Sequence, residues 1–176
     1  MSYLREARRV IDIEIAGLQA VRGRLNASFN RAVAVIVETI DSGGKIVVAG
    51  VGKSGNIGRK IAATLTSTGT TSVLLDSVDA LHGDLGILRD GDLVILLSYS
   101  GESEELVHLL PAMRRFDIQL LALSGSAKST LGRSSDIVID VSVPSEACPF
   151  NLAPTASTTA TLAMGDALAM AVLKAR

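Results

Sequence analysis

Five short, nearly all-apolar runs are the feature of this sequence that most constrains its fold. The runs cover residues 45–50, 71–76, 92–98, 118–124 and 136–143. An apolar run that does not alternate with polar residues is typical of a strand buried on both faces, and such strands belong to parallel sheets. Most of the segments between the runs are long enough for the helix that a parallel connection requires. The sequence therefore predicts an α/β fold.

Much of the remaining sequence has the apolar periodicity of helices. Apolar residues recur at helical spacing over residues 3–21, and a second helix is predicted over 27–40, ending at the turn-forming Asp41–Gly44. Further helices are predicted over residues 56–68, 104–116, 127–132 and 155–174. We expect a three-layer α/β/α architecture around a five-stranded parallel sheet with the common strand order 2-1-3-4-5.

The composition narrows the class of protein. A length of 176 residues fits a single domain over residues 1–176, with N-terminal helices at 3–41 and a sheet–helix core at 45–176. The net charge of -1, without a basic run, argues against a nucleic-acid surface. One cysteine, Cys148, forms neither an internal disulfide nor a C-x-x-C metal site. The charged start is unlike a signal peptide, and no uninterrupted apolar run is membrane-long, so we expect a cytoplasmic protein without a membrane helix.

The loop after the first predicted strand carries two overlapping phosphate-binding patterns. Residues 50–55, Gly-Val-Gly-Lys-Ser-Gly, contain both G-x-G-x-x-G and Gly-Lys-Ser. A triphosphate loop, G-x-x-x-x-G-K-[ST], needs a glycine five residues before Gly52, but that position is Val47, inside the strand. This mismatch argues against a nucleoside triphosphate.

A dinucleotide such as NAD fits the first loop better. Its G-x-G-x-x-G follows a predicted strand, opens a predicted helix and has Asp76 at the end of the next strand. However, Lys53 and Ser54 place polar side chains where a dinucleotide loop needs only backbone near the pyrophosphate. The hydroxyl-rich loop after the third strand is also more than a dinucleotide requires. An NAD-binding domain therefore stays an alternative.

That hydroxyl-rich loop contains Ser98, Ser100, Gly101 and Ser103. In the predicted strand order both loops face the switch point at which ligands bind. Together with Ser54 and a helix N-terminus, the serine hydroxyls suit a single phosphomonoester, and Gly101 lets the backbone approach it. The alternative is that Ser98 and Ser103 only end a strand and cap a helix, although Ser103 lacks the acid of a capping box.

Longer stretches of the sequence resemble one known family. They read GVGKSGNIGRKIAATLTSTGT, HGDLG, SYSGESEE, SEACP and LAPTASTTATLAMGDALAMAVLKAR. From about residue 5 to the end, the chain is similar to the sugar isomerase (SIS) domain of D-arabinose 5-phosphate isomerases. The combination of SEACP with the last stretch is specific to this branch, whereas other SIS proteins share only S-x-S-G-x-[ST].

The resemblance implies an aldose–ketose isomerase that interconverts D-arabinose 5-phosphate and D-ribulose 5-phosphate through an enediol. It implies a homotetramer that uses no organic cofactor and no metal, and a product that feeds lipopolysaccharide or capsule synthesis. A non-catalytic sugar-phosphate sensor and an isomerase of another phosphosugar, such as hexulose 6-phosphate, stay open. A sensor of the regulator type carries a DNA-binding domain, for which the residues before the first strand are too few and too neutral.

Four residues match those that line the site of the resembling enzymes. For Lys53 the resemblance implies phosphate binding, together with Gly52 and Ser54, or stabilisation of the enediolate. For His82 it implies a role in opening the sugar ring or a contact to the sugar hydroxyls. Glu146, bracketed by prolines, is the first candidate for the base that moves the proton between C1 and C2, and Glu105 is the second.

The resembling enzymes continue beyond the matched segment with a tail that contains a histidine thought to be catalytic, and longer relatives add a pair of CBS domains. The sequence stops at Arg176. A truncated chain, a tail that was not retained and a non-catalytic relative are all consistent with this. For the 176 residues alone we expect phosphosugar binding with impaired turnover.

Overall fold

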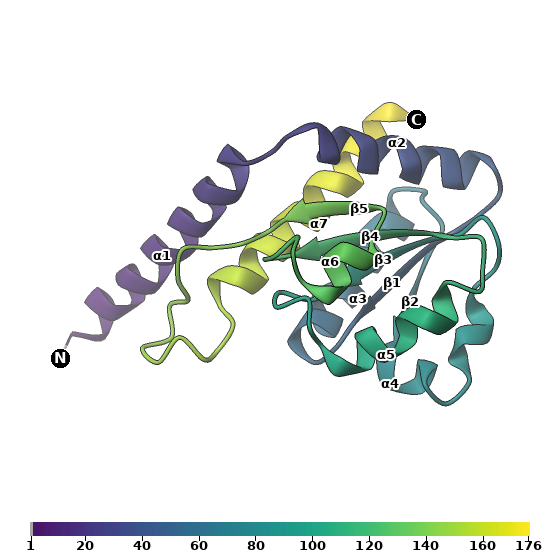
Figure 1. Cartoon of the computed structure of the whole chain (residues 1–176). Helices are drawn as coiled ribbons and strands as arrows, with labels where there is room; N and C mark the ends of the chain where they lie inside the picture. The colour runs from purple at the N-terminus through teal and green to yellow at the C-terminus, as the bar shows by residue number, and fades with distance from the viewer. Residues whose placement is uncertain (1) are drawn as a thin grey trace.

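The computed structural model describes residues 2–176, in which a five-stranded sheet lies between two layers of helices (Figure 1). The strands are β1 (Ile46–Gly50), β2 (Ser72–Asp76), β3 (Leu93–Leu97), β4 (Gln119–Ser124) and β5 (Ile137–Asp140). All neighbouring strands are parallel, and their order is β2-β1-β3-β4-β5. The predicted α/β architecture and strand order are confirmed.

The helices agree with the predicted periodicity in most places. They are α1 (Tyr3–Gly23), α2 (Ala27–Asp41), α3 (Lys53–Ser67), α4 (Ser77–Ala80), η1 (a 3-10 turn, Asp84–Ile87), α5 (Glu104–Met113), α6 (Thr130–Ser134) and α7 (Ala156–Ala175). Helix α3 begins three residues earlier than predicted, directly after the turn at Gly52. The single turns α4 and η1 were not predicted, because they are too short for a periodic signal. Strand β5 ends earlier than predicted, at Asp140, whose carboxylate accepts a hydrogen bond from Ser142 N–H at 2.8 Å.

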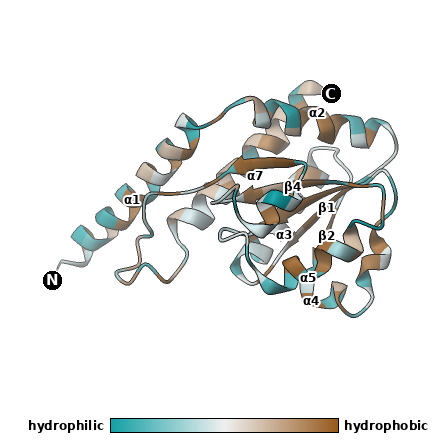
Figure 2. Cartoon of the chain, viewed as in Figure 1, coloured by the Kyte–Doolittle hydropathy of each residue, from teal (hydrophilic) through white to brown (hydrophobic). Residues whose placement is uncertain are grey.

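Alternate residues of each strand enter two separate aliphatic cores. On one face Val48, Ile95 and Leu123 pack with residues of α2, α3 and α7. On the other face Val47, Val94 and Leu120 pack with residues of α5 and α6. Figure 2 shows the strands as apolar throughout, whereas the surface helices alternate between polar and apolar residues. This double burial explains why the strands read as continuous apolar runs.

Helix α7 is long and apolar enough to cross a membrane when only length and composition are considered. Half of its most apolar window is nevertheless buried inside the fold, where α7 lies against α1, α2 and α3. Asp166 of α7 forms an ion pair with Lys60 of α3. These contacts make α7 the central helix of its layer.

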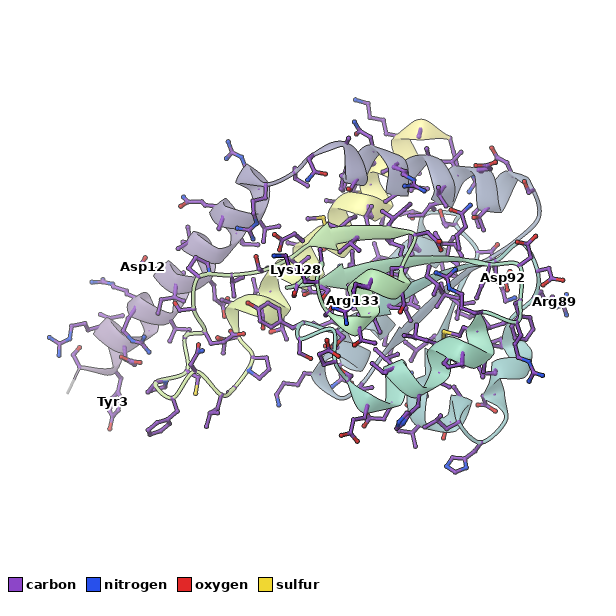
Figure 3. All side chains as sticks on the ribbon, viewed as in Figure 1. Tyr3, Asp12, Arg89, Asp92, Lys128 and Arg133 are labelled. Carbon is purple, nitrogen blue, oxygen red and sulfur yellow. The ribbon has the colours of Figure 1, made fainter. Side chains whose placement is uncertain are left out.

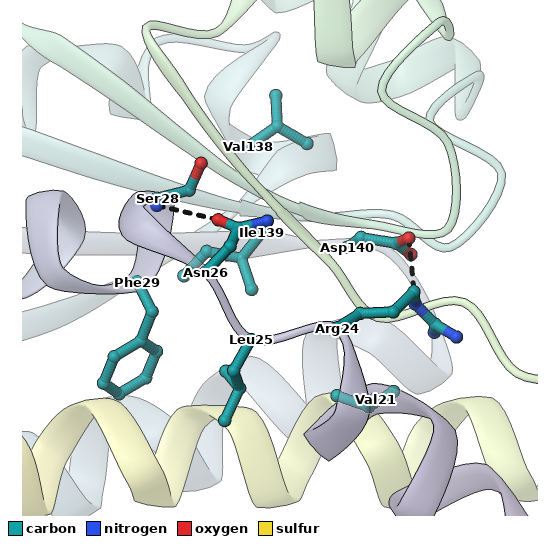
Figure 4. A pocket seen from close by; sticks show the side chains of 9 residues that line it. All are labelled: Val21, Arg24, Leu25, Asn26, Ser28, Phe29, Val138, Ile139 and Asp140. Carbon is teal, nitrogen blue, oxygen red and sulfur yellow. Dashed lines mark hydrogen bonds and ion pairs between the residues drawn. The ribbon is translucent and has the colours of Figure 1, made fainter.

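The turn between α1 and α2 is fastened to the end of β5 (Figure 4). Arg24 Nε pairs with Asp140 Oδ2 at 3.1 Å, and the Arg24 guanidinium also donates to Ser142 O. Asn26 caps α2 by accepting a hydrogen bond from Ser28 N–H at 2.8 Å. The hollow among these side chains measures about 10 Å³, which holds at most one water molecule. This part of the molecule therefore anchors α1 and offers no ligand site.

Candidate functional site

The first two loops of interest start side by side at the carboxyl edge of the sheet. Gly50, the last residue of β1, is the register partner of Leu97, the last residue of β3. On its other side Gly50 faces Asp76, the last residue of β2. The loops β1–α3 and β3–α5 therefore leave the sheet as neighbours, which is the arrangement that the strand order predicts.

The glycines of the β1–α3 loop shape a tight turn from strand to helix. A Cβ on Gly50 would lie 2.9 Å from the Ser54 carbonyl carbon, and a Cβ on Gly55 would lie 2.8 Å from Gly50 O. Gly52 has φ +56° and precedes the first residue of α3. The G-x-G-x-x-G spacing is thus explained by backbone packing, whichever ligand the loop binds.

The start of α3 leaves hydrogen-bond donors open. Gly52 has no side chain to cap the helix, and the N–H groups of Lys53 and Ser54 bond to no residue among 2–176. The Lys53 side chain is exposed and forms no ion pair with the described residues. A cation at the positive end of a helix is electrostatically favourable when an anion lies between them. The helix start therefore suits an anionic ligand.

Ser98 stabilises the β3–α5 loop from its buried side and is only 2% exposed. The Ser98 hydroxyl lies 2.8 Å from the Ser103 hydroxyl and accepts a hydrogen bond from Gly101 N–H at 3.1 Å. Gly101 itself is buried with φ +69°, and a Cβ there would collide with the Ser129 side chain. Ser98 and Gly101 were predicted to contact phosphate, and the contacts that the structure shows for them shape the loop.

Donors of the β3–α5 loop remain open on its outer side. Ser103 precedes α5 without capping it through its side chain, so the helix-cap half of the structural alternative does not apply to Ser103. The N–H groups of Glu104 and Glu105 have no partner within residues 2–176. Ser100 accepts a hydrogen bond from Glu102 N–H at 3.2 Å and keeps its own proton for donation. The open donors and the positive end of α5 fit an oxyanion.

The carboxyl groups near this loop have different surroundings. Glu102 is not merely a solvated acid at a helix start, because its Oε1 accepts a hydrogen bond from Thr130 N–H at 2.7 Å. This bond lowers the pKa of Glu102. Glu105, in the first turn of α5, is half-buried, and its carboxylate has no hydrogen bond or ion pair within the described residues.

Glu146 lies in the loop between β5 and α7 and caps the N-terminus of α7. Its Oε2 accepts hydrogen bonds from Thr155 N–H at 2.8 Å, from the Thr155 hydroxyl at 2.9 Å and from Ser157 N–H at 3.3 Å. Burial raises the pKa of the Glu146 carboxyl, but the hydrogen bonds from Ser157 and Thr155 together lower it by more, so the net shift is downward. Glu146 is thus an anchored carboxylate, and its hydrogen bonds with the described residues all end on one oxygen.

Comparison with known proteins places this arrangement in a family. Residues 39–171 match the SIS domain family. The chain belongs to the SIS domain family.

Several relatives of the SIS domain have names or bound ligands that describe a function. The chain is 47% identical over 176 residues to the arabinose 5-phosphate isomerase KdsD of Yersinia pestis and 46% identical over 175 residues to GutQ, an arabinose 5-phosphate isomerase of Salmonella typhi. These alignments include 100% and 99% of this chain but only 53% and 54% of the two relatives. The chain therefore spans about half of their length. A solved protein of E. coli CFT073, c3406 in complex with arabinose 5-phosphate, is 36% identical with a TM-score of 0.94, covering 98% of this chain and 90% of that one.

The predicted site residue His82 has no side-chain hydrogen bond within residues 2–176. It lies in the loop after α4, its side chain is exposed, and its only hydrogen bond among residues 2–176 is made by its backbone N–H to Asp79 O at 2.9 Å. The loop follows β2, so it belongs to the same edge of the sheet as the two phosphate loops. The structure does not bring the imidazole into contact with Lys53, Glu105 or Glu146.

A cleft of about 300 Å³ opens beside the first loop, lined in part by Gly52, Asn56, Arg59 and Asp76. This volume is at the lower limit for a pocket that encloses a small organic ligand. Asp76, the acid expected to bind ribose in a dinucleotide site, uses its Oδ1 to cap α4 at Val78 N–H, 2.9 Å away. Both observations count against the NAD alternative. Within residues 2–176, no three His, Cys, Asp or Glu side chains are grouped to hold a metal ion.

Sequence reasoning missed the partners that hold the candidate groups. Thr155 binds Glu146, and its place at the start of a predicted helix is the signal that could have identified it as part of a cap. Tyr99 contacts Val143, 44 residues away, and no local pattern indicates this contact. Cys148 is half-buried, and backbone N–H groups, Ala153 foremost, lower the pKa of its thiol.

Proposed function

We propose that this SIS domain is the catalytic domain of an intramolecular aldose–ketose isomerase that interconverts D-arabinose 5-phosphate and D-ribulose 5-phosphate. The observation that carries the proposal is the pair of neighbouring helix starts, α3 and α5, with open N–H and hydroxyl donors. The names of the KdsD and GutQ relatives and the arabinose 5-phosphate bound to the c3406 protein support the choice of substrate.

The phosphate of the substrate supplies binding energy and position rather than reactivity. Ser54, Ser100 and Ser103 donate their hydroxyl protons to its oxygens, together with the open backbone N–H groups and the Lys53 ammonium. Gly52 keeps the first turn open, and buried Ser98 holds the second loop in shape. Gly101, with φ +69°, provides the backbone turn of the second loop, so each predicted phosphate-loop residue has a role.

The proton transfer needs a base near C1 and C2 of the open-chain sugar. Glu146 is the first candidate, because Oε2 is anchored at α7 and Oε1 remains for the substrate. As base, Glu146 removes the C2 proton of the aldose and returns it at C1, while a donor such as Lys53 stabilises the enediolate oxygens. Glu105 remains the second candidate, and His82 would assist ring opening. Glu146 is ionised at neutral pH, as a base must be, and the hydrogen bonds that lower its pKa make it a weaker base than an unpaired glutamate.

Assembly and location are part of the same proposal. Helix α1 exposes Tyr3, Leu4, Ile11 and Ile15, whose exposed fractions range from 46% to 86%. A second copy that covers these side chains would remove apolar surface from water, which supports a homotetramer. Phosphorylated sugars are cytoplasmic metabolites, which supports a cytoplasmic enzyme that supplies lipopolysaccharide or capsule synthesis. Light scattering on the eluted protein measures the number of copies, and a monomer would contradict the assembly.

The experiment that tests the function is incubation with D-ribulose 5-phosphate in D₂O, followed by NMR. We expect D-arabinose 5-phosphate to appear with solvent deuterium at C2, because the base takes a proton from C1, exchanges it with D₂O while the enediol is bound, and delivers a deuteron to C2. D-Hexulose 6-phosphate serves as the competing substrate. Tight binding of arabinose 5-phosphate without conversion would contradict the isomerase and would leave a sugar-phosphate sensor.

A further inference from the structure

Tyr99 connects the two parts of the candidate site. Tyr99 belongs to the phosphate loop, residues 98–103. Its hydroxyl contacts the glutamate segment, residues 143–146, which ends at Glu146. The Tyr99 hydroxyl accepts a hydrogen bond from Val143 N–H at 3.1 Å and donates one to Val143 O at 3.4 Å. Both hydrogen-bonding directions of the hydroxyl are therefore used on one residue of the glutamate segment.

The position of Tyr99 within the phosphate loop is fixed from several sides. Its backbone O accepts hydrogen bonds from Gly125 N–H at 2.9 Å and from the Ser124 hydroxyl at 3.4 Å. The ring lies over Gly125, where an added Cβ would be only 3.0 Å from the ring carbon Cε2. The ring therefore moves with the phosphate loop and with the end of β4, which leaves it little freedom of its own.

The glutamate segment is short and stiff. Val143 packs against Gly17 of α1, where an added Cβ would lie 3.1 Å from Val143 Cγ1. Pro144 follows and has a fixed φ. Glu146 N–H donates to Asn151 Oδ1 at 2.9 Å. Only two residues separate Val143 from Glu146, so we expect a shift of the main chain at Val143 to reach the glutamate.

We infer that Tyr99 is a positioning residue whose hydroxyl couples the phosphate loop to Glu146. Phosphate bound by the loop fixes Tyr99, Tyr99 fixes the main chain at Val143, and the Glu146 carboxylate is held where it meets C1 and C2. The inference rests on the proposed function, in which the phosphate binds this loop and Glu146 is the base. Through this coupling, binding of the phosphate also positions the carboxylate that acts at C1 and C2.

The test is Tyr99→Phe, which removes the hydroxyl and keeps the ring. Tyr3→Phe is the matched control, because the Tyr3 hydroxyl at the start of α1 forms no hydrogen bond with the described residues, and phenylalanine keeps the ring that a second copy would cover (Figure 3). In Tyr99→Phe we expect kcat to fall roughly three- to tenfold, the cost of one or two neutral hydrogen bonds. KM should change by less than about twofold, because the phosphate contacts remain. The control should match wild type in both constants.

Amide hydrogen exchange gives a second measurement that does not depend on turnover. We expect inorganic phosphate to slow exchange at Val143 in wild type and in Tyr3→Phe. In Tyr99→Phe, Val143 should exchange faster, and phosphate should no longer slow it. Protection by phosphate that persists in Tyr99→Phe overturns the inference, as does a fall in kcat matched by a rise in KM. Absence of isomerisation in wild type refutes the proposed function, while the exchange data still decide the coupling.

Discussion

A buried carboxylate at the amino end of the sheet is fully hydrogen-bonded, whereas backbone donors at its carboxyl end are left open within residues 2–176. At the amino end the buried Asp92 accepts hydrogen bonds from Lys45 N–H at 3.0 Å and Arg89 N–H at 2.9 Å, and its Oδ2 lies 2.5 Å from Lys45 Nζ. Figure 3 shows Asp92 and Arg89 at the opposite side of the molecule from Tyr3 and the rest of α1. At the carboxyl end the N–H groups that begin α3 and α5 have no partner among the described residues.

The comparison separates stability from function within the same strands. Asp92, only 3% exposed, would be costly to leave unpaired, and the fold satisfies it completely. The open donors at the other end cost less because water reaches them, and they remain available to a ligand. We therefore expect substitutions at the amino end to lower stability, and substitutions at the carboxyl end to lower activity or ligand affinity.

The largest expected effect is that of Glu146→Gln on turnover. The amide keeps an oxygen that accepts the hydrogen bonds from Thr155 but cannot take a proton from carbon. We expect kcat to fall by about 10²- to 10⁴-fold, a far larger effect than the loss of stability that the missing carboxylate charge causes at neutral pH. Steady-state kinetics with both phosphosugars measures this, and Glu105→Gln is the parallel variant. Near-normal turnover in Glu146→Gln, together with loss of turnover in Glu105→Gln, would assign the base to Glu105.

Asp92→Ala tests the amino end of the sheet. The substitution leaves the partly buried Lys45 ammonium without its carboxylate, and the backbone N–H groups of Lys45 and Arg89 lose their acceptor. We expect the free energy of unfolding to fall by about 3–5 kcal/mol. Urea denaturation measures the loss. Turnover at a temperature where the variant is folded should equal that of wild type, and a selective loss of kcat would break the comparison.

Ser103→Ala tests the open donors at the carboxyl end. Loss of one hydroxyl donor to a charged phosphate should weaken phosphosugar binding by about 1.5–3 kcal/mol, or roughly ten- to a hundredfold. Ser67→Ala is the matched control, because the Ser67 hydroxyl at the far end of α3 donates only to Thr64 O, at 2.9 Å. Calorimetric titration with arabinose 5-phosphate should separate the two variants. Equal affinities would mean that Ser103 does not contact the phosphate.

The pH dependence of stability should show a smaller effect. The pKa of Glu146 is lowered from its ordinary value of 4.5 in the folded chain. A carboxyl with a lowered folded pKa adds stability above its unfolded pKa and loses that stability as the pH falls through the folded pKa. The stability difference between wild type and Glu146→Gln should therefore be largest near neutral pH and close as the solution is acidified below about 4.5. A difference that grows on acidification would contradict the sign of the shift.

Much of the fold could be predicted because its signals are local and repeated. The strands are buried on both faces, so each appears as an uninterrupted apolar run, and the linkers between them leave few alternative topologies. The neighbouring positions of the first and third loops followed from the strand order alone. The serines were then recognised as possible phosphate ligands by their residue type.

The finer structure of the site could not be predicted, because it depends on contacts between distant segments. Ser98 reads as a surface donor in the sequence, yet its burial depends on how α6 and β4 pack around Gly101. Glu102 reads as a solvated acid, but it binds Thr130 N–H, 28 residues away. Such contacts are set by tertiary packing, for which a single sequence carries no spacing rule.

The close approach of Gly50 and Gly55 has a consequence for reading such patterns in other sequences. Here a helix starts directly above the end of a strand, and the two crossing backbones leave no space for a methyl group, so glycine at this interval has a steric reason of its own. A nucleotide is then neither implied nor excluded by the spacing. Discrimination rests on the residues between the glycines, here a lysine and a serine, and on the chemistry of the neighbouring loop.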